Sequence, residues 1–181
     1  MAEHTSSPMT ALREGLLDLA IVYTPSTDRR VELRPLFDDE LVVVLPPDHK
    51  LANRGAIAPS MLRGESVFVY TTSDRENSVV RDILDPAGVS ASKITHIQLT
   101  EAIIELVAAG LGIAVLAEWA VAPAVRAGAV KVARIGKQGF NRTWYAAVRS
   151  ADVTPAYRFD LIELLSRTLR PGPAVRELRR T

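Results

Sequence analysis

Hydroxyl and carboxylate side chains gather where apolar runs of this sequence end. The apolar runs at 19–23 and 66–70 are each followed by hydroxyl residues, and two predicted helices begin with Thr-Glu and Glu-Trp. Helix N-termini carry unpaired N–H groups and a partial positive charge that attract carboxylates, and a glutamate can hold an ammonium group. We therefore expect an amino-acid-like ligand. The candidate binding residues are Tyr23, Thr24, Thr71, Thr72, Ser73, Thr100, Glu101, Glu118 and Trp119.

Each of these positions also has a purely structural interpretation. The hydroxyl residues after position 70 can serve as loop and helix-capping residues, and Thr100 is a natural N-cap for the helix that follows. Trp119 is a good candidate for partly buried packing, although aromatic residues also line the edges of clefts. Both interpretations remain open at this stage.

The sequence argues against an enzyme. Its three histidines, His4, His49 and His96, fall in a terminus, a turn and a strand without a pattern of partners. It contains neither the H-E-x-x-H nor the G-x-S-x-G motif, and the absence of cysteine excludes thiolate metal sites. We interpret the acidic residues at 38–40 as a solvated bend. We expect no catalytic residues, no metal and no cofactor.

Charge and hydropathy limit the partners of the chain. Its 181 residues include 22 basic and 21 acidic side chains, and the formal charge is +1. A DNA-binding surface needs concentrated positive charge, so this balance argues against direct nucleic-acid binding. The N-terminus does not resemble a secretory signal, and no apolar stretch is long enough to span a membrane. We expect a cytoplasmic protein without membrane contact.

Strand-like and helix-like segments alternate along the chain, which is typical of an α/β fold with mainly parallel sheets. Gly15 is expected to end a helix in the left-handed conformation. Thr154 is expected to cap the last helix, whose apolar face would carry leucines and Tyr157. Predicted strands cover 19–23, 31–36, 41–45, 66–70, 94–99, 113–116, 130–133 and 143–148, and predicted helices cover 77–84, 100–110, 119–127 and a segment from 154 onward.

Three segments, in order, resemble the LysR-type transcriptional regulators. LREGLLDLAIVYTP is similar to the family's "L..G.LDLAI" segment, and residues 35–44 followed by PDHKLA resemble its crossover strand and "P.DHPLA" motif. ELVAAGLGIAVLAEW is similar to "V..G.GIA.LP", although Ala117 stands where the family usually has proline. Within the family, the methionine-pathway regulators are most similar, on short stretches such as those at 86–90 and 145–149.

The resemblance implies a type 2 periplasmic-binding-protein-like fold, with two Rossmann-like lobes joined by two crossovers and not by one continuous sheet. Lobe I would comprise residues 1–42 and 141–170, and lobe II residues 46–135. The crossovers would lie at 43–47 and 136–141, and 171–181 would form a disordered basic tail. A small-molecule effector would bind in the cleft between the lobes, where strand ends and helix N-termini meet.

The resemblance also implies parts that this sequence does not supply. Family members begin with a winged helix-turn-helix, a linker helix and the first strands of lobe I, and nothing before Gly15 matches these. We therefore expect an N-terminally truncated effector-binding domain with an incomplete lobe I. It would form a homodimer, reach DNA only through the missing domain, and sense a metabolite such as homocysteine. The alternative is a stand-alone cytosolic binding protein of the same fold.

Overall fold

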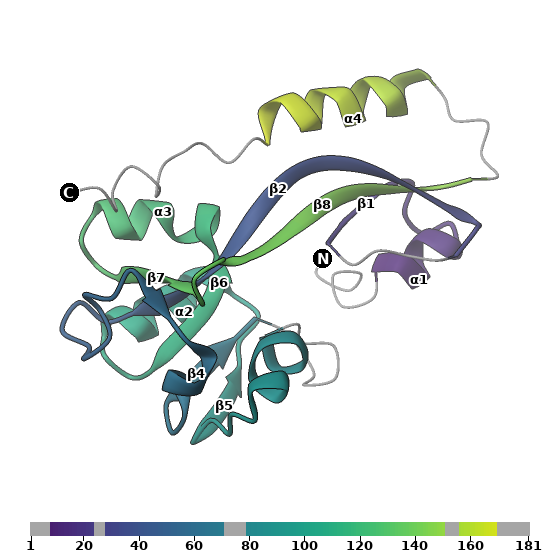
Figure 1. The fold of residues 1–181 in the computed structure, drawn as a ribbon. Helices are drawn as coiled ribbons and strands as arrows, with labels where there is room; N and C mark the ends of the chain where they lie inside the picture. The colour runs from purple at the N-terminus through teal and green to yellow at the C-terminus, as the bar shows by residue number, and fades with distance from the viewer. Residues whose placement is uncertain (1–7, 24–27, 71–78, 151–155, 170–181) are drawn as a thin grey trace. The chain divides into compact units, whose positions relative to one another are not determined.

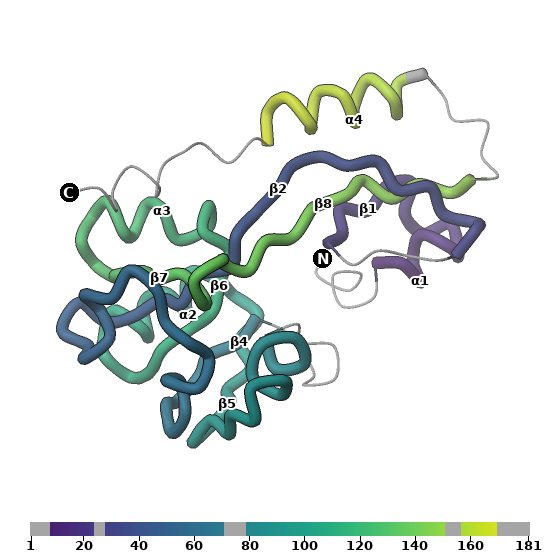
Figure 2. The backbone as a smooth tube through the Cα atoms, in the orientation of Figure 1, coloured from purple at the N-terminus to yellow at the C-terminus, as the bar shows by residue number. Residues whose placement is uncertain are grey.

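A computed structural model describes residues 8–23, 28–70, 79–150 and 156–169. The chain divides into two compact units (Figures 1 and 2). Unit 1 comprises Met1–Asp39 and Arg142–Gly172, and unit 2 comprises Glu40–Asn141 and Pro173–Thr181. The boundaries fall within two long strands, β2 (Val31–Leu45) and β8 (Phe140–Arg149), each of which contributes to both units.

Unit 2 is built around the second half of β2. This segment lies between β6 (Ile113–Ala117) and β7 (Lys131–Ile135) and pairs antiparallel with both. Beyond β6 the strands are parallel, because β4 pairs parallel with β6 and with β5. The remaining strands of unit 2 are β3 (Ala56–Ile57), which pairs parallel with β7, β4 (Ser66–Val69) and β5 (Lys93–His96).

Both faces of this sheet are covered, so its central strands are apolar on both sides. Along LVVVL, Leu41, Val43 and Leu45 enter one core while Val42 and Val44 enter the other. The second core is closed by α2 (Thr100–Ala108) and α3 (Glu118–Arg126). Short helical turns cover the first core. They are a 3-10 turn at Pro59–Leu62, before β4, and a π-helical turn at Val80–Leu84 that continues directly into a 3-10 turn at Asp85–Ala87.

Unit 1 consists of α1 (Pro8–Arg13), β1 (Ala20–Val22), the first half of β2, most of β8, and α4 (Ala156–Thr168). Gly15 has φ +76° and closes α1, as its sequence position predicts. β1 pairs antiparallel with β8, with Val22 opposite Tyr145. One core lies between α1 and this sheet around Leu12, and another lies under α4 around Ile162.

Three expectations about the elements are wrong. The sheet is mixed and not mainly parallel. Its strands pair in the order β1-β8-β2-β6-β4-β5 and form one continuous sheet in place of two separate sheets. The acidic residues at 38–40 do not form a solvated bend, because β2 runs unbroken from Val31 to Leu45 and Asp39 and Glu40 are buried. The strand continues because both carboxylates find arginine partners.

The inward face of α4 also differs from the prediction. Arg158 and Ile162 are buried, whereas four of the residues expected to be apolar contacts are exposed. Arg158 can face inward because its guanidinium group is paired with Asp18 at 2.7 Å. The predicted cap at Thr154 lies outside the described residues. The exposed residues are Tyr157, Leu161, Leu164 and Leu169.

Candidate functional site

Four of the predicted binding residues lie at one edge of the unit 2 sheet. Because β4, β5 and β6 are parallel, their carboxyl ends meet at the same edge. α2 follows β5 and begins with Thr100 and Glu101, while α3 directly follows β6 and begins with Glu118 and Trp119. Open α/β sheets bind ligands at this carboxyl edge, which makes it the candidate effector-binding edge of unit 2.

The local structure at this edge corrects one prediction. Thr100 is the first residue of α2 and not its N-cap, because Leu99 occupies the capping position in an extended conformation without a side-chain capping bond. The Thr100 hydroxyl is therefore not used to cap this helix. Trp119 is 47% exposed, which is compatible both with partly buried packing and with a place at the edge of a cleft. Thr24, Thr71, Thr72 and Ser73 lie outside the described residues.

Tyr23 lies in unit 1, directly after β1, and belongs to a cluster that the sequence did not reveal. Its ring meets the Trp144 ring edge-on at a centroid distance of 5.4 Å, and Trp144 stacks on Phe37 at 6.1 Å. The guanidinium carbon of Arg142 lies 4.6 Å from the centre of the Tyr23 ring and 4.9 Å from that of Trp144. These distances are within the range of cation–π attraction.

Asp39 holds this cluster together. Its side chain is 1% exposed, and its Oδ2 accepts hydrogen bonds from Arg142 Nε at 3.0 Å and Nη2 at 2.9 Å. The indole Nε1 of Trp144 donates to the same oxygen at 3.2 Å. A buried carboxylate requires such compensation by charge and donors. The cluster therefore fixes the orientation of a positively charged group between two aromatic rings.

Sequence reasoning missed Asp39, Arg142 and Trp144 because the partners are 103 and 105 positions apart along the chain. One available signal was the alternation of β2 itself. If LVVVL is extended backward as an unbroken strand, Asp39 falls on the same face as Leu41, which predicts a carboxylate at a buried position. The acidic character of neighbouring residues obscured that signal.

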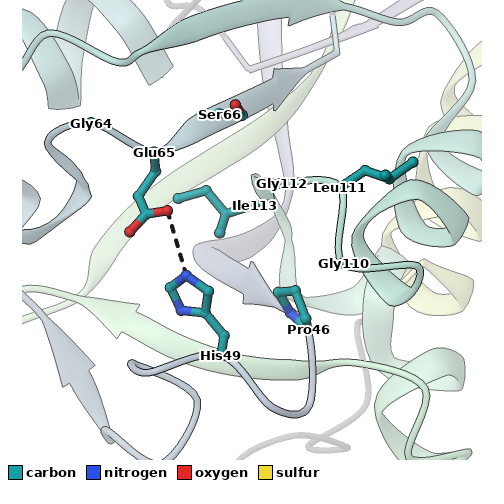
Figure 3. A pocket seen from close by; sticks show the side chains of 9 residues that line it. All are labelled: Pro46, His49, Gly64, Glu65, Ser66, Gly110, Leu111, Gly112 and Ile113. Atoms are coloured by element: carbon teal, nitrogen blue, oxygen red, sulfur yellow. Dashed lines mark ion pairs between the residues drawn. The ribbon is translucent and has the colours of Figure 1, made fainter.

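The structure also contains a cavity of about 250 Å³ at the opposite, amino edge of the unit 2 sheet (Figure 3). Its polar centre is His49, which points toward Glu65 with Nε2 3.5 Å from the carboxylate Oε2. The backbone N–H of Leu51 donates to His49 Nδ1, so neutral His49 carries its proton on Nε2. The lining residues are Pro46, His49, Gly64, Glu65, Ser66, Gly110, Leu111, Gly112 and Ile113.

Glu65 of this cavity forms ion pairs with His49 and Lys50. Burial alone would raise the pKa of Glu65, but the hydrogen bond and charge of Lys50, 2.7 Å away, together with His49 hold that pKa below its usual value. With its Nε2 protonated, His49 has no lone pair left for a metal ion. Within the described part of the chain, no three potential metal-binding side chains come together. The cavity therefore offers less for recognition than the opposite edge.

Comparison with known proteins agrees with this fold. The family model described as "LysR substrate binding domain" matches residues 1–170, so the chain belongs to this family. Its curated relatives include the HTH-type transcriptional regulator MetR of Escherichia coli, 36% identical over 148 residues, which are 82% of this chain and 46% of that protein. MetR of Haemophilus influenzae is 30% identical over 178 residues, 97% of this chain and 57% of that protein.

Among solved structures, the regulatory domain of MetR from N. meningitidis superimposes with a TM-score of 0.81. The two are 31% identical, and the match covers 89% of this chain and 74% of that one. The resemblance to LysR-type regulators and the periplasmic-binding-protein-like fold predicted from sequence are thereby confirmed. The chain spans about half the length of the curated relatives it matches. None of the described helices is long and apolar enough to cross a membrane.

Proposed function

We propose that this chain is the effector-binding domain of a cytoplasmic LysR-type transcription regulator and that it senses an amino-acid-like metabolite. The observation that carries the proposal is that α2, which begins with Thr100 and Glu101, and α3, which begins with Glu118, both start at the carboxyl edge of the unit 2 sheet. Ligands of open α/β folds bind at such edges. Control of transcription would require a DNA-binding segment outside this chain, and by analogy with the family the regulator would act as a homodimer.

The chemistry of this edge suits a small zwitterion. The first backbone N–H groups of α2 and α3 and the Thr100 hydroxyl are donors for the oxygen atoms of a ligand. Glu101 is exposed in the first turn of α2, where it can accept a charge-assisted hydrogen bond from an ammonium group. Trp119, which is half exposed, offers an apolar surface beside these polar groups. The proposed binding residues also include Tyr23 and the hydroxyl residues outside the described ranges, Thr24, Thr71, Thr72 and Ser73.

The identity of the effector is proposed from the relatives. Regulators named MetR are among the proteins similar to this chain. Homocysteine is the first candidate because the sequence of this chain resembles those of the methionine-pathway regulators. Methionine and homoserine share its amino-acid group but differ in the side chain, so they separate recognition of the zwitterion from recognition of the thiol.

Isothermal titration calorimetry of the full chain with homocysteine, methionine and homoserine tests this proposal. We expect saturable binding of at least one of them, weakened about tenfold by Thr100→Val through the loss of one hydrogen bond. Thr95→Val, in β5 of the same unit, is the matched control and is expected to bind like the parent. If none of the three compounds binds the parent chain, the amino-acid class of effector is wrong.

A further inference from the structure

The cavity at the amino edge of the unit 2 sheet is built around one carboxylate, that of Glu65 (Figure 3). Glu65 directly precedes β4, and its side chain is 15% exposed. Its pKa is held below the usual value, so the group is ionised at neutral pH. A charge that is mostly shielded from water acts more strongly on a ligand than one in free solution. The cavity therefore favours a cation, whereas a zwitterionic effector would bring its own carboxylate beside this charge.

The two oxygen atoms of Glu65 have different neighbours. Oε1 lies 2.7 Å from Lys50 Nζ, in a close ion pair. Oε2 faces His49 Nε2 at 3.5 Å, which is longer than the usual N–H···O hydrogen bond of about 2.7–3.2 Å. His49 is fixed by the turn after β2, because its backbone N–H donates to the Pro46 carbonyl and its Nδ1 accepts from Leu51 N–H. Oε2 thus keeps the capacity to accept a stronger hydrogen bond from a further donor.

Lys50 compensates the charge of Glu65 only in part. Its side chain is 70% exposed, so water and salt screen the ammonium group. It is also carried on a flexible stem of four carbons, which lets the group move without disturbing the turn. Neutral His49 supplies a donor but no charge. Glu65 therefore retains an attraction for a second ammonium group, which the charge of Lys50 weakens but does not cancel.

The rest of the cavity, whose volume is about 250 Å³, suits a short aliphatic chain. Pro46, directly after β2, and Ile113, the first residue of β6, contribute apolar side chains to its lining. Gly64 and Gly110 border the cavity without side chains, and no described atom lies within 4 Å of a Cβ added to either. The space beside Glu65 is therefore open, and the carbon atoms of a ligand would leave water for an apolar surface.

We propose that this cavity binds a small primary aliphatic ammonium ion, whose nitrogen donates to Glu65 Oε2 and whose carbon chain lies against Pro46 and Ile113. The site lies at the amino edge of β4 and β6, and the candidate effector-binding edge lies at their carboxyl ends. It is a second ligand site of unit 2 and does not depend on the identity of the effector. Lys50 is a competing cation supplied by the chain itself.

Titration of the isotope-labelled full chain with butylammonium, followed by nuclear magnetic resonance, tests this site. We expect saturable shifts of the amide signals of Gly64, Gly110 and Gly112, which line the cavity. Butan-1-ol has the same carbon chain without the charge and is expected to give no saturable shift of these signals over the same concentration range. If the two compounds give equal shifts, the cavity does not recognise the ammonium group and the proposal is wrong.

Three variants assign the recognition to Glu65. Glu65→Gln keeps the shape of the side chain and is expected to weaken butylammonium binding at least tenfold, because a charge-assisted hydrogen bond is lost. Lys50→Met removes the competing cation and is expected to strengthen binding about threefold. Glu32→Gln is the matched control, because Glu32 also pairs with a basic side chain but lies in unit 1, and it is expected to bind like the parent.

Two outcomes with these variants would overturn the proposal. Binding by Glu65→Gln that is as tight as that of the parent would show that the carboxylate does not hold the ligand. Weaker binding by Lys50→Met than by the parent would show that Lys50 is part of the site and not a competitor. Absence of saturable binding by both the parent and Lys50→Met contradicts the site altogether.

A measurement on the parent chain keeps the proposal testable if Glu65→Gln does not fold. The carbon-13 signal of the Glu65 carboxyl group is expected to shift with butylammonium along the same saturation curve as the glycine amides. Butan-1-ol is expected to leave this signal within its line width. A Glu65 signal that stays unchanged while other carboxyl signals move would place the ammonium ion elsewhere and would contradict the proposal.

Discussion

Asp39 and Glu40 are neighbours in β2 and are both buried acids paired with an arginine, yet they lie in different units and different surroundings. Asp39 pairs in unit 1 with Arg142, which is 15% exposed and packed against aromatic rings. Glu40 pairs in unit 2 with Arg134, which is 35% exposed and donates its Nη2 to the Gln138 carbonyl. Arg142 thus packs against aromatic rings, whereas Arg134 is hydrogen-bonded to the backbone of a turn.

This difference shows how one strand can serve two purposes at adjacent positions. Successive side chains of a strand point to opposite faces, so each carboxylate recruits its own partner from a distant part of the chain. The Glu40–Arg134 pair lies against the turn between β7 and β8. Gly139 in this turn has no side chain, and an added Cβ would clash with both members of the pair. The Asp39 pair instead organises the cluster of Tyr23, Phe37 and Trp144. The same kind of ion pair thus fixes a backbone turn on one face and a group of aromatic rings on the other.

Replacing Asp39 by asparagine is expected to have the largest effect. The substituted amide would keep the shape of the side chain but leave the mostly buried guanidinium group of Arg142 without its counter-charge. Removing one member of a buried ion pair costs about 3–5 kcal/mol, and we expect Asp39→Asn to lower the free energy of unfolding by about 3 kcal/mol. Urea unfolding followed by tryptophan fluorescence measures this; a loss below about 1 kcal/mol would show that the pair is dispensable.

Gly139→Ala tests the turn on the other side of the comparison. Gly139 has φ +76°, and an added Cβ would lie 2.5 Å from Glu40 Oε1 and 2.7 Å from Arg134 Nη2. Strain and overpacking together are expected to cost about 2–3 kcal/mol. Gly136→Ala is the control, because it has φ +64° but no atom within 4 Å of an added Cβ. Its cost should be about 1 kcal/mol, and equal losses in the two variants would argue against the contact with Glu40.

Glu40→Gln is expected to cost less than Asp39→Asn. Arg134 reaches solvent more freely than Arg142, so hydration compensates part of the lost charge, and we expect a loss of about 1–2 kcal/mol. Glu32→Gln, in the same strand, removes a surface pair with Arg34 and should cost no more than about 0.5 kcal/mol. The same urea experiment ranks the three variants, and a larger loss for Glu40→Gln than for Asp39→Asn would reverse the comparison.

The elements that the sequence predicts well are those whose apolar pattern is local. LVVVL and GIAVL are recognisable as strands because nearly every residue is apolar. The helix that follows GIAVL ends near Gly128, which has φ +71°. The candidate edge of unit 2 follows from the same local pattern, since a strand end and a helix start can both be located from it, but its role in binding stays a prediction. The family resemblance supplied the order of these segments.

The features that the sequence did not predict depend on pairs distant along the chain. Three consecutive acids resemble a solvated bend unless the arginines that neutralise Asp39 and Glu40 are known, and those lie 103 and 94 positions away. The inward face of α4 was wrong for a related reason. Arg158 is buried because of Asp18, 140 positions earlier, and this pairing overrides the local hydrophobic pattern.

Glu65 is a third carboxylate that pairs with basic side chains. Of the substitutions considered, Glu65→Gln is expected to change the free energy of unfolding least, and its effect depends on pH. Burial raises the pKa of Glu65, but Lys50 and His49 outweigh burial, so the pKa lies below the ordinary value of 4.5. A carboxyl group with a lowered pKa in the folded state stabilises the protein above the unfolded-state pKa, and this contribution is lost as the pH falls through the folded-state pKa. The stability difference between the parent and Glu65→Gln should therefore shrink below about pH 4.5.

Lys50→Met separates the two partners that oppose burial at Glu65. Lys50 is the strongest of them, through both its hydrogen bond and its charge. Without it, burial should prevail and raise the pKa of Glu65, which a carbon-13 titration of the carboxyl group can measure. An unchanged pKa in Lys50→Met would show that His49 alone balances burial and that Lys50 contributes little to this pair.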